Sequence, residues 1–327
     1  KYGADAVRIG MLLCSSAGND IFYDESQVEQ GRNFCNKIWN SFRLVQGWTV
    51  DERLQQSEVN KLAVNWFESK LNQTIYAVED HYSKFRISDA LMSIYKLFWD
   101  EYCAWYLEAI KPAFGDSIDK ATHDATIIFF EKLLKMIHPV MPFITEELWQ
   151  SMAERKEGET IMYQPTPKAG PVDEKVIEEF GIAQEAVNGI RGIRQQKNIS
   201  PKESLVLKVK GDFPMNMLPV IIKLANISSV ENVADFGDAA GVSLLVRTVE
   251  LFVPLEGLVD VEEEIKKIET ELEHQRGFLE SVRKKLSNES FVAHAPEKVV
   301  ALERKKEADS LSKIESYEKA LAALKNR

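Results

Sequence analysis

Hydrophobic residues near the C-terminus recur every three or four positions along a stretch otherwise rich in Glu and Lys. This spacing is the a/d repeat of a coiled-coil helix. The first stripe comprises Leu258, Val261, Ile265, Ile268, Leu272, Leu279, Val282 and Leu286, with Gln275 as its one polar member. A second, less regular stripe comprises Val299, Leu302, Leu311, Ile314, Tyr317, Leu321 and Leu324. The pattern predicts an antiparallel coiled-coil hairpin over 258–327, with an arm roughly 35–40 Å long.

The tip of this hairpin is apolar where a solvated turn is usually polar. Phe291 and Val292 lie between the cationic run 283–285 and Lys298. Apolar surface beside cations suits a nucleic-acid backbone with exposed bases. A dimerising or bracing coiled coil, or a tip packed on itself, explains the same residues without RNA. The candidate RNA contacts of the arm are Arg283, Lys284, Lys285, Phe291 and Lys298.

Apolar stripes at helical spacing also run through most of residues 1–165. The predicted helices are Glu29–Gln46, Lys61–Phe85, Ile87–Ala109, Thr122–His138 and Thr145–Glu154. Helices of this kind joined by loops of modest length predict a helical bundle. A Pro- and Gly-containing stretch over 165–171 then marks a boundary, so the first domain is expected to span 1–171.

The pattern changes after residue 171 to a mixture of helical and alternating segments. A helix over Asp173–Lys197 and a short helix over Met215–Ala225 are predicted, with strands at Ser204–Lys210, Val242–Arg247 and Val249–Val253. These elements predict a small α/β subdomain over 172–257. The expected fold class is therefore mainly α: a helical bundle, a small α/β subdomain and a C-terminal coiled-coil hairpin.

Composition and net charge argue against several classes of protein. The chain has 327 residues and a formal net charge of −10, which argues against wholesale wrapping of nucleic acid and leaves room for local recognition. No apolar run reaches the roughly twenty residues of a membrane span. The cysteines at 14, 35 and 103 are widely spaced and form no Cys-x-x-Cys pair, so we expect no structural metal and a reducing, cytoplasmic setting. The opening residues lack a Met, and we expect a fragment of a longer protein.

Motifs for catalysis are absent from the sequence. It contains no glycine-rich phosphate loop, no Gly-x-Ser-x-Gly elbow and no His-Glu-x-x-His. His123 and His138 stand alone among apolar residues and are expected to be structural. We therefore expect no catalytic residue and no metal ligand.

The predicted helix Glu29–Gln46 carries an unusual polar face. Asn33, Asn36, Lys37 and Asn40 share one side of the helix, opposite its apolar stripe. Asn is a poor residue for a mid-helix surface, because its side chain competes for backbone hydrogen bonds. An amide can pair with an adenine edge, and single-stranded RNA presents such edges unpaired. Amides that bond to neighbouring helices are the alternative.

Five motifs in order resemble those of the class I aminoacyl-tRNA synthetases. Residues 1–8 (KYGADAVR), 18–20 (GND) and 31–40 (GRNFCNKIWN) resemble the segment that follows the Lys-Met-Ser-Lys-Ser loop. Residues 99–108 (WDEYCAWYLE) and 138–149 (HPVMPFITEELW) resemble the anticodon-binding bundle of the isoleucine, leucine and valine group. Residues 285–292 (KLSNESFV) with 295–300 (APEKVV) are similar to the tRNA-binding arm of the valine family, and the cysteine-rich zinc module usual in the isoleucine family is missing.

The resemblance implies a monomeric ligase that uses ATP with Mg and valine, charges tRNA(Val) and clears mischarged threonine. It places that chemistry in N-terminal catalytic and editing domains, so this region is expected to hold no cofactor and to bind tRNA. The implied anticodon-binding residues are Arg32, Asn33, Asn36, Lys37, Asn40 and Arg43. Leu44 departs from relatives with an aromatic there, and Trp39 is a possible substitute for base stacking. A non-catalytic protein-interaction scaffold, and the same region of an isoleucine- or leucine-type synthetase, are the alternatives.

Overall fold

A computed structural model describes residues 1–13, 23–237, 241–255 and 261–287, together with a set of single residues of the final helix. Those residues are Glu303, Arg304, Lys306, Glu307, Ser310, Leu311, Ile314 and Glu318. Close contacts divide the chain into two units. The first unit comprises 1–193, 201–236 and 243–253, and the second comprises 194–200, 237–242 and 254–327.

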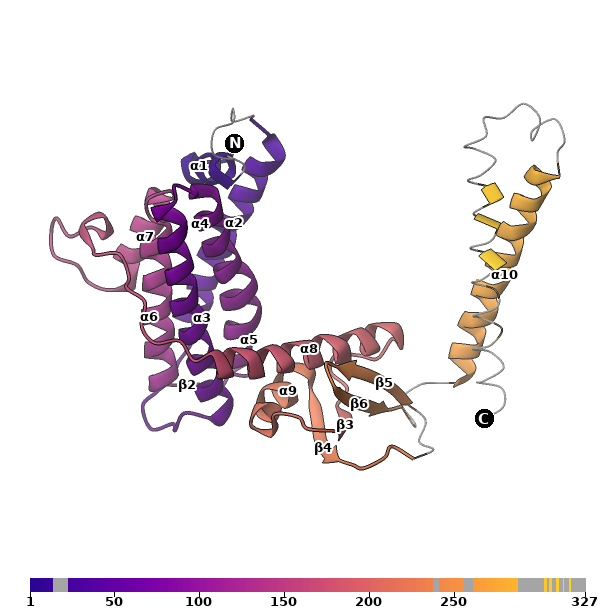
Figure 1. The fold of residues 1–327 in the computed structure, drawn as a ribbon. Coiled ribbons are helices and arrows are strands. Elements are labelled where there is room, and N and C mark those ends of the chain that lie inside the picture. Colours follow the sequence, from indigo (N-terminus) through magenta and orange to yellow (C-terminus); the bar gives the residue numbers. More distant parts are fainter. Residues whose placement is uncertain are drawn as a thin grey trace. The chain divides into compact units, whose positions relative to one another are not determined.

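The first unit begins with a helical bundle (Figure 1). Its helices are α1 (Ala4–Leu13), α2 (Glu25–Gln46), α3 (Glu58–Ser83), α4 (Ile87–Lys96), α5 (Leu107–Ile110), α6 (Lys120–Ile137) and α7 (Pro142–Met152). A π-helical segment, Leu97–Tyr106, joins α4 to α5. The structure confirms the mainly α class and the five predicted helices to within a few residues, and it adds α1, which the sequence pattern did not predict.

Aromatic side chains fill the core of the bundle. The Phe67 ring centroid lies 4.9 Å from that of Tyr106, and the Phe98 centroid lies 5.5 Å from that of Tyr102. Phe34 of α2 reaches the same cluster, with its centroid 5.6 Å from that of Phe98. Stacked, tilted and edge-on ring pairs of this kind add to the free energy gained from burial. The run 99–108 thus contributes Tyr102 and Tyr106 to the core.

Helices α1 and α2 cross at very short range because glycine lies at the contact. A Cβ atom on Gly31 would lie 2.3 Å from the Ala6 carbonyl oxygen, and one on Gly10 would lie 2.6 Å from the Gln27 carbonyl oxygen. Neither distance is possible for a real side chain. Glycine at both positions thus sets how closely the first helix packs.

Helix α1 also fixes the start of α7. The buried Asp5 carboxylate accepts backbone N–H bonds from Ile144 at 2.7 Å and Phe143 at 3.4 Å, which satisfies donors of the first turn. Arg8 donates from Nε to the Val140 carbonyl at 2.7 Å. Two of the motif segments, 1–8 and 138–149, are therefore joined to each other in the fold.

His138 belongs to the same junction. Its Nδ1 atom lies 2.7 Å from the Thr145 hydroxyl oxygen, and that hydroxyl donates its one proton to the Met141 carbonyl. Burial lowers the pKa of His138, and the charges of Glu146 and Asp5 act in the opposite direction. These contacts give His138 a structural role.

The small α/β subdomain follows. Helix α8 (Glu174–Gln196) precedes β3 (Leu205–Lys210), a 3₁₀ turn (Met215–Met217), α9 (Leu218–Ala225), β4 (Ile227–Asn232), β5 (Gly241–Val246) and β6 (Val249–Pro254). The sheet order is β4-β3-β6-β5, with β3 parallel to β4 and antiparallel to β6. Strand β4 escaped prediction because its sequence is mostly polar and exposed, with Ser228, Ser229, Glu231 and Asn232.

The second unit contains the predicted hairpin. Helix α10 spans Val261–Leu286, and the described residues of the returning segment are also helical. Arg283 pairs with Glu307 at 2.8 Å and Arg276 with Glu318 at 2.6 Å, so the two segments run antiparallel.

Side-chain packing within the hairpin follows the predicted seam in part. Leu272, Leu279 and Ile314 form a buried cluster. Of the second stripe, Leu311 and Ile314 belong to the described residues. Ile314 is buried as predicted, but Leu311 is 43% exposed and its neighbour Ser310 is buried instead. The helix is thus rotated slightly from the register that the hydrophobic pattern indicated.

Two searches of the described residues were negative. No helix among them is both long and apolar enough to cross a bilayer. No group of three or more His, Cys, Asp or Glu side chains in the same part of the chain is placed to hold a metal ion. The domain boundaries at 171 and 257 stay predictions.

Candidate nucleic-acid interface

The exposed side of α2 presents free amide groups. Asn33, Asn36 and Asn40 are all exposed, and the described part of the chain supplies no hydrogen-bond partner for their side chains. The residues of the predicted apolar stripe, Phe34, Ile38, Phe42 and Val45, are buried on the opposite side. The described residues therefore do not support the alternative that these amides hydrogen-bond to neighbouring helices. The amides face solvent, where a ligand can reach them.

Lys37 does not project with these amides. It is half-buried, and its ammonium nitrogen lies 5.4 Å from the centroid of the Trp99 ring. Trp99 in turn stacks on Tyr95, with centroids 5.6 Å apart and an angle of 19° between the rings. A lysine over an indole face is held by a cation–π interaction. Lys37 therefore forms the edge of an aromatic surface next to the amides.

Arg32 lies in the N-terminal half of the helix, directly before Asn33. Its guanidinium pairs with Glu29 at 2.9 Å and lies 5.6 Å from the centroid of the Tyr2 ring. At about 1.5 Å of rise per residue, roughly 16 Å of helix separate it from Arg43. The structure thus does not bring the predicted anticodon-binding residues into one cluster.

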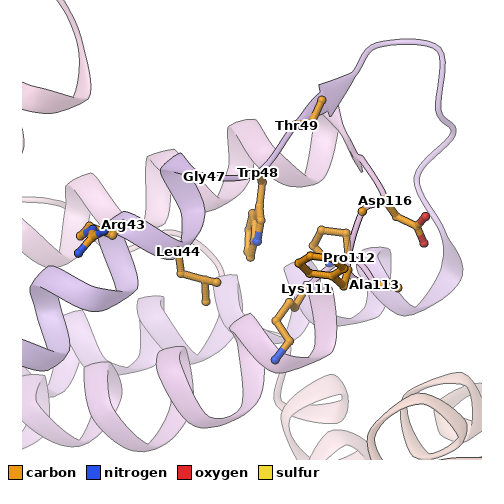
Figure 2. Close-up of a pocket in the computed structure, with 11 residues that line it drawn as sticks. Arg43, Leu44, Gly47, Trp48, Thr49, Lys111, Pro112, Ala113 and Asp116 are labelled. Atoms are coloured by element: carbon orange, nitrogen blue, oxygen red, sulfur yellow. The ribbon is translucent and has the colours of Figure 1, made fainter.

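Arg43 opens onto a hollow at the C-terminal end of α2 (Figure 2). This Trp48 hollow has a volume of about 530 Å³. One wall comes from the end of α2, with Arg43, Leu44, Gly47, Trp48 and Thr49, and the other from the loop Lys111–Asp116. Figure 2 shows the Trp48 indole between Leu44 and the Lys111–Pro112 segment. The sequence analysis included only Arg43 and Leu44 of this set.

Local structure explains why the two walls meet. Strand β1 (Val50–Asp51) pairs in parallel with β2 (Ile118–Asp119), and the Ile118 N–H donates to the Thr49 carbonyl at 2.9 Å. Asp119 then caps α6 through its carboxylate, which accepts from the Thr122 N–H at 2.8 Å. Gly115 has a φ of +90°, a conformation that favours glycine in the turn between the walls. The hollow is therefore built by a pairing too short to show in the sequence pattern.

The chemistry of the Trp48 hollow combines cations with aromatic rings. Arg43 is exposed, and Lys111 is half-buried and bridged to Glu108 at 2.8 Å. The Phe114 side chain is fully exposed, at 108% of its reference area. Aromatic faces bind unpaired bases by stacking, and cations beside them bind the phosphate backbone. The hollow can therefore hold a nucleotide of a single-stranded loop.

The two described cysteines near this surface are not nucleophiles. Burial raises the pKa of the Cys35 thiol to about 11 and that of the Cys103 thiol to about 12. For Cys103, the nearby Lys37 charge opposes the effect of burial without cancelling it. Both groups thus stay protonated near neutral pH, where the thiolate is the reactive form.

In the arm, Arg283, Lys284 and Lys285 are exposed on the last turn of α10. Arg283 forms the surface ion pair with Glu307 described above, and such pairs contribute little to stability. The other two predicted arm contacts, Phe291 and Lys298, lie outside the described residues.

Comparisons with known proteins identify two domains in this chain. Residues 64–210 match the family model of the anticodon-binding domain of tRNA ligase, and residues 260–325 match that of the valyl tRNA synthetase tRNA binding arm. The valine–tRNA ligase of Parabacteroides distasonis is 52% identical over 324 residues. That of Phocaeicola vulgatus is 53% identical over 326 residues. Each match covers 99% of this chain and 37% of the relative, so the chain spans about 37% of the length of these enzymes.

The first match begins within α3 and runs to the end of β3, and the second covers the hairpin. The relatives are valine–tRNA ligases rather than isoleucine- or leucine-type enzymes. The chain therefore belongs to the valine–tRNA ligase family and carries its anticodon-binding domain and its tRNA-binding arm.

Proposed function

We propose that this chain is the tRNA-binding part of a cytoplasmic, monomeric valine–tRNA ligase. It recognises tRNA(Val) so that catalytic and editing domains of the same enzyme can attach valine with ATP and Mg and remove mischarged threonine. The observation that carries the proposal is the surface along α2, where free Asn amides lead to Arg43 and the Trp48 hollow. The described residues contribute tRNA binding alone.

Within this proposal, the anticodon loop lies along the C-terminal half of α2. Asn36 and Asn40 contact base edges, and Arg43 and Lys111 contact the backbone. Trp48 and Phe114 supply the aromatic surface that Leu44 does not. Lys37 supports the surface through Trp99, and Arg32 and Asn33 lie toward the α1 end. Amide contacts to an adenine edge suit the middle base of the tRNA(Val) anticodon, which is adenine.

The arm has a separate role in the proposal. Helix α10 has 26 residues, which corresponds to a length of about 39 Å. A rod of this length reaches the outer corner of a folded tRNA, tens of ångströms from the anticodon. Arg283, Lys284, Lys285, Phe291 and Lys298 would contact phosphates and shape there rather than sequence.

A filter-binding titration with tRNA(Val) transcript over a range of salt concentrations tests the proposal. We expect the chain to bind the transcript with an association constant whose logarithm falls linearly with the logarithm of the salt concentration. Deletion of Val261–Leu324 should weaken binding and reduce that slope, because fewer phosphate contacts release fewer counterions. A dimer that becomes a monomer on deletion and keeps its full RNA affinity would contradict the role of the arm. Absence of any tRNA binding by the intact chain would contradict the whole proposal.

A further inference from the structure

A corner of the bundle, where α3 ends and α4 begins, exposes three large apolar side chains. These are Tyr82, Phe85 and Ile87, and the Phe85 side chain is 84% exposed. Apolar side chains that lie together on the surface of a soluble protein often mark a contact with another molecule or domain. We call this set the Phe85 corner. It contains none of the candidate site residues of the sequence analysis.

The backbone holds Phe85 in a conformation that a bulky residue rarely adopts. Its φ is +58°, in the left-handed region. The Phe85 N–H donates to the Tyr82 carbonyl at 3.0 Å. The Arg86 N–H donates to the His81 carbonyl at 2.9 Å. These two bonds form the Schellman arrangement at the end of a helix, in which glycine is usual at the left-handed position.

Packing among the described residues does not compensate for this strain. A phenylalanine in the left-handed conformation carries a steric cost that glycine avoids. The Phe85 ring is so exposed that it buries very little apolar surface against the described part of the chain. Strained residues persist where a function requires them. The exposed, strained ring therefore points to a contact that the described residues do not make.

The charges around the Phe85 corner favour protein over RNA as the partner. Lys84 pairs with Asp80 at 2.6 Å. The other charged residues of the segment, Glu79, Arg86 and Asp89, are also exposed. Two cations against three carboxylates give a net charge of −1. RNA binding depends on an excess of cations that contact phosphates, so an apolar corner with nearly balanced charges suits a protein surface better.

The size of the corner argues against a separate protein as the partner. A large aromatic side chain buries about 150–250 Å², so three partly exposed apolar side chains offer at most roughly 500 Å². A stable complex between separate proteins buries about 800 Å² on each partner. A domain of the same polypeptide needs less area, because covalent linkage gives it a high effective concentration. The corner therefore fits a domain of the same polypeptide better than a second copy of the chain.

Helix α1 lies at the same end of the bundle as this corner (Figure 1). The hydroxyl of Ser88, directly after Ile87, donates to the carbonyl of Leu12 in α1 at 2.8 Å. The chain spans about 37% of the length of the valine–tRNA ligases that it matches. The larger part of such an enzyme is thus available to cover the corner.

We propose that the Phe85 corner docks on the catalytic domain of the same ligase. The Phe85 ring enters an apolar pocket of that domain, and the Tyr82 and Ile87 side chains pack around the ring. The left-handed backbone directs the ring outward, so the strain at Phe85 serves the contact between the two domains. This inference rests on the proposed function in one respect, namely that the chain is part of such a ligase. The contact itself involves no RNA.

Hydroxyl-radical footprinting of aromatic side chains tests this contact in the absence of tRNA. The intact ligase is compared with the isolated chain. Phe114, a fully exposed ring on the loop after α5, is the internal control. Phe85 and Tyr82 should be labelled several-fold more slowly in the intact ligase, and Phe114 should be labelled at the same rate in both proteins. Equal labelling of Phe85 in the two proteins would overturn the proposal.

A glycine variant gives a second, independent readout. Phe85→Gly should keep or raise the urea midpoint of the isolated chain, because glycine adopts the left-handed conformation without steric cost. In the intact ligase, the same variant should raise the labelling rate of Tyr82 to that in the isolated chain. Phe114→Gly is the matched control and should leave the labelling of Tyr82 unchanged. A lower urea midpoint for Phe85→Gly in the isolated chain would show that the chain's own fold needs the ring, and would overturn the proposal.

Addition of tRNA(Val) separates this inference from the proposed function. If Phe85 is labelled rapidly in the free ligase and becomes protected only with tRNA(Val), the corner is an RNA contact, so the inference fails and the proposed function stands. If protection in the isolated chain rises with protein concentration, the occupant is a second copy and the inference fails. If the isolated chain does not bind tRNA(Val) but Phe85 is protected in the intact enzyme, the proposed function fails and the docking contact stands.

Discussion

The two ends of helix α2 show how one helix can serve packing and binding separately. Toward the N-terminus, Gly31 lies against α1 with no room for a side chain, and Arg32 is engaged by Glu29 and Tyr2. Toward the C-terminus, Asn36, Asn40 and Arg43 are exposed, and the helix ends at the Trp48 hollow. The first end has its interactions within the protein, and the second has exposed polar groups next to a hollow.

This difference separates stability from recognition within one motif. The run 31–40 contains Gly31 and Arg32 from the first group and Asn36 and Asn40 from the second, so its residues do not share one role. Substitutions at the first end should change the free energy of unfolding and leave the RNA surface intact. Those at the second end should change RNA affinity and leave the free energy of unfolding unchanged.

The largest effect is expected for Gly31→Ala. The new methyl group would lie 2.3 Å from the Ala6 carbonyl oxygen, so α1 must move. We expect a loss of about 3 kcal/mol or more in the free energy of unfolding, at or above the usual range for overpacking. Urea denaturation measures it. Gly192→Ala is the matched control, because a Cβ there meets nothing within 4 Å. That control should be neutral or stabilising by up to about 1 kcal/mol, and a similar loss in both variants would show that the helix crossing is not the cause.

The next effect concerns the aromatic wall of the Trp48 hollow. Phe114 is fully exposed, so Phe114→Ala should leave the free energy of unfolding unchanged. It should weaken binding of the anticodon hairpin by about 1–3 kcal/mol, the value for one base stacked on an aromatic ring. Phe143→Ala, at another exposed phenylalanine (66%), is the control and should bind normally. Unchanged affinity in Phe114→Ala would remove Phe114 from the interface.

These two predictions also show how far the sequence could go. The apolar stripe of α2 and its polar face follow from helical spacing alone, and the structure confirms both. The Trp48 hollow could not be predicted, because Lys111 and Phe114 reach it through the pairing of β1 with β2, which involves two residues in each strand. The aromatic Trp48, directly after the Gly47 that caps α2, was the one local signal.

The different surroundings of Arg32 and Arg43 also depend on contacts between segments that lie far apart in the sequence. Both arginines lie on the predicted helix. The three-residue spacing of Glu29 and Arg32 predicts an ion pair, but nothing in the sequence places Tyr2 beside Arg32. Spacing within a helix predicts which residues share a face, whereas contacts between distant segments decide which of them are free.

A smaller effect is expected from the two arginines of α2. Arg43→Gln should weaken hairpin binding about tenfold or less and reduce the salt slope by about one, as expected for the loss of a phosphate contact. Arg32→Gln removes the same charge and should change both quantities less, because Arg32 lies roughly 16 Å along the helix from Arg43 and the Trp48 hollow. Filter binding at several salt concentrations measures both variants. Equal losses would mean that the RNA surface extends along the whole helix.

The central claim is that the C-terminal half of α2 recognises the anticodon of tRNA(Val), and discrimination at the middle base tests it most directly. Affinities of wild-type protein, Asn36→Ala and Asn40→Ala are measured for the anticodon hairpin with its middle adenine and with each other base. Both amides are exposed, so neither variant should unfold. We predict that the wild-type chain prefers adenine and that at least one variant loses about 1–3 kcal/mol of this preference, as for a bidentate contact. Equal preference for adenine in all three proteins would contradict the claim.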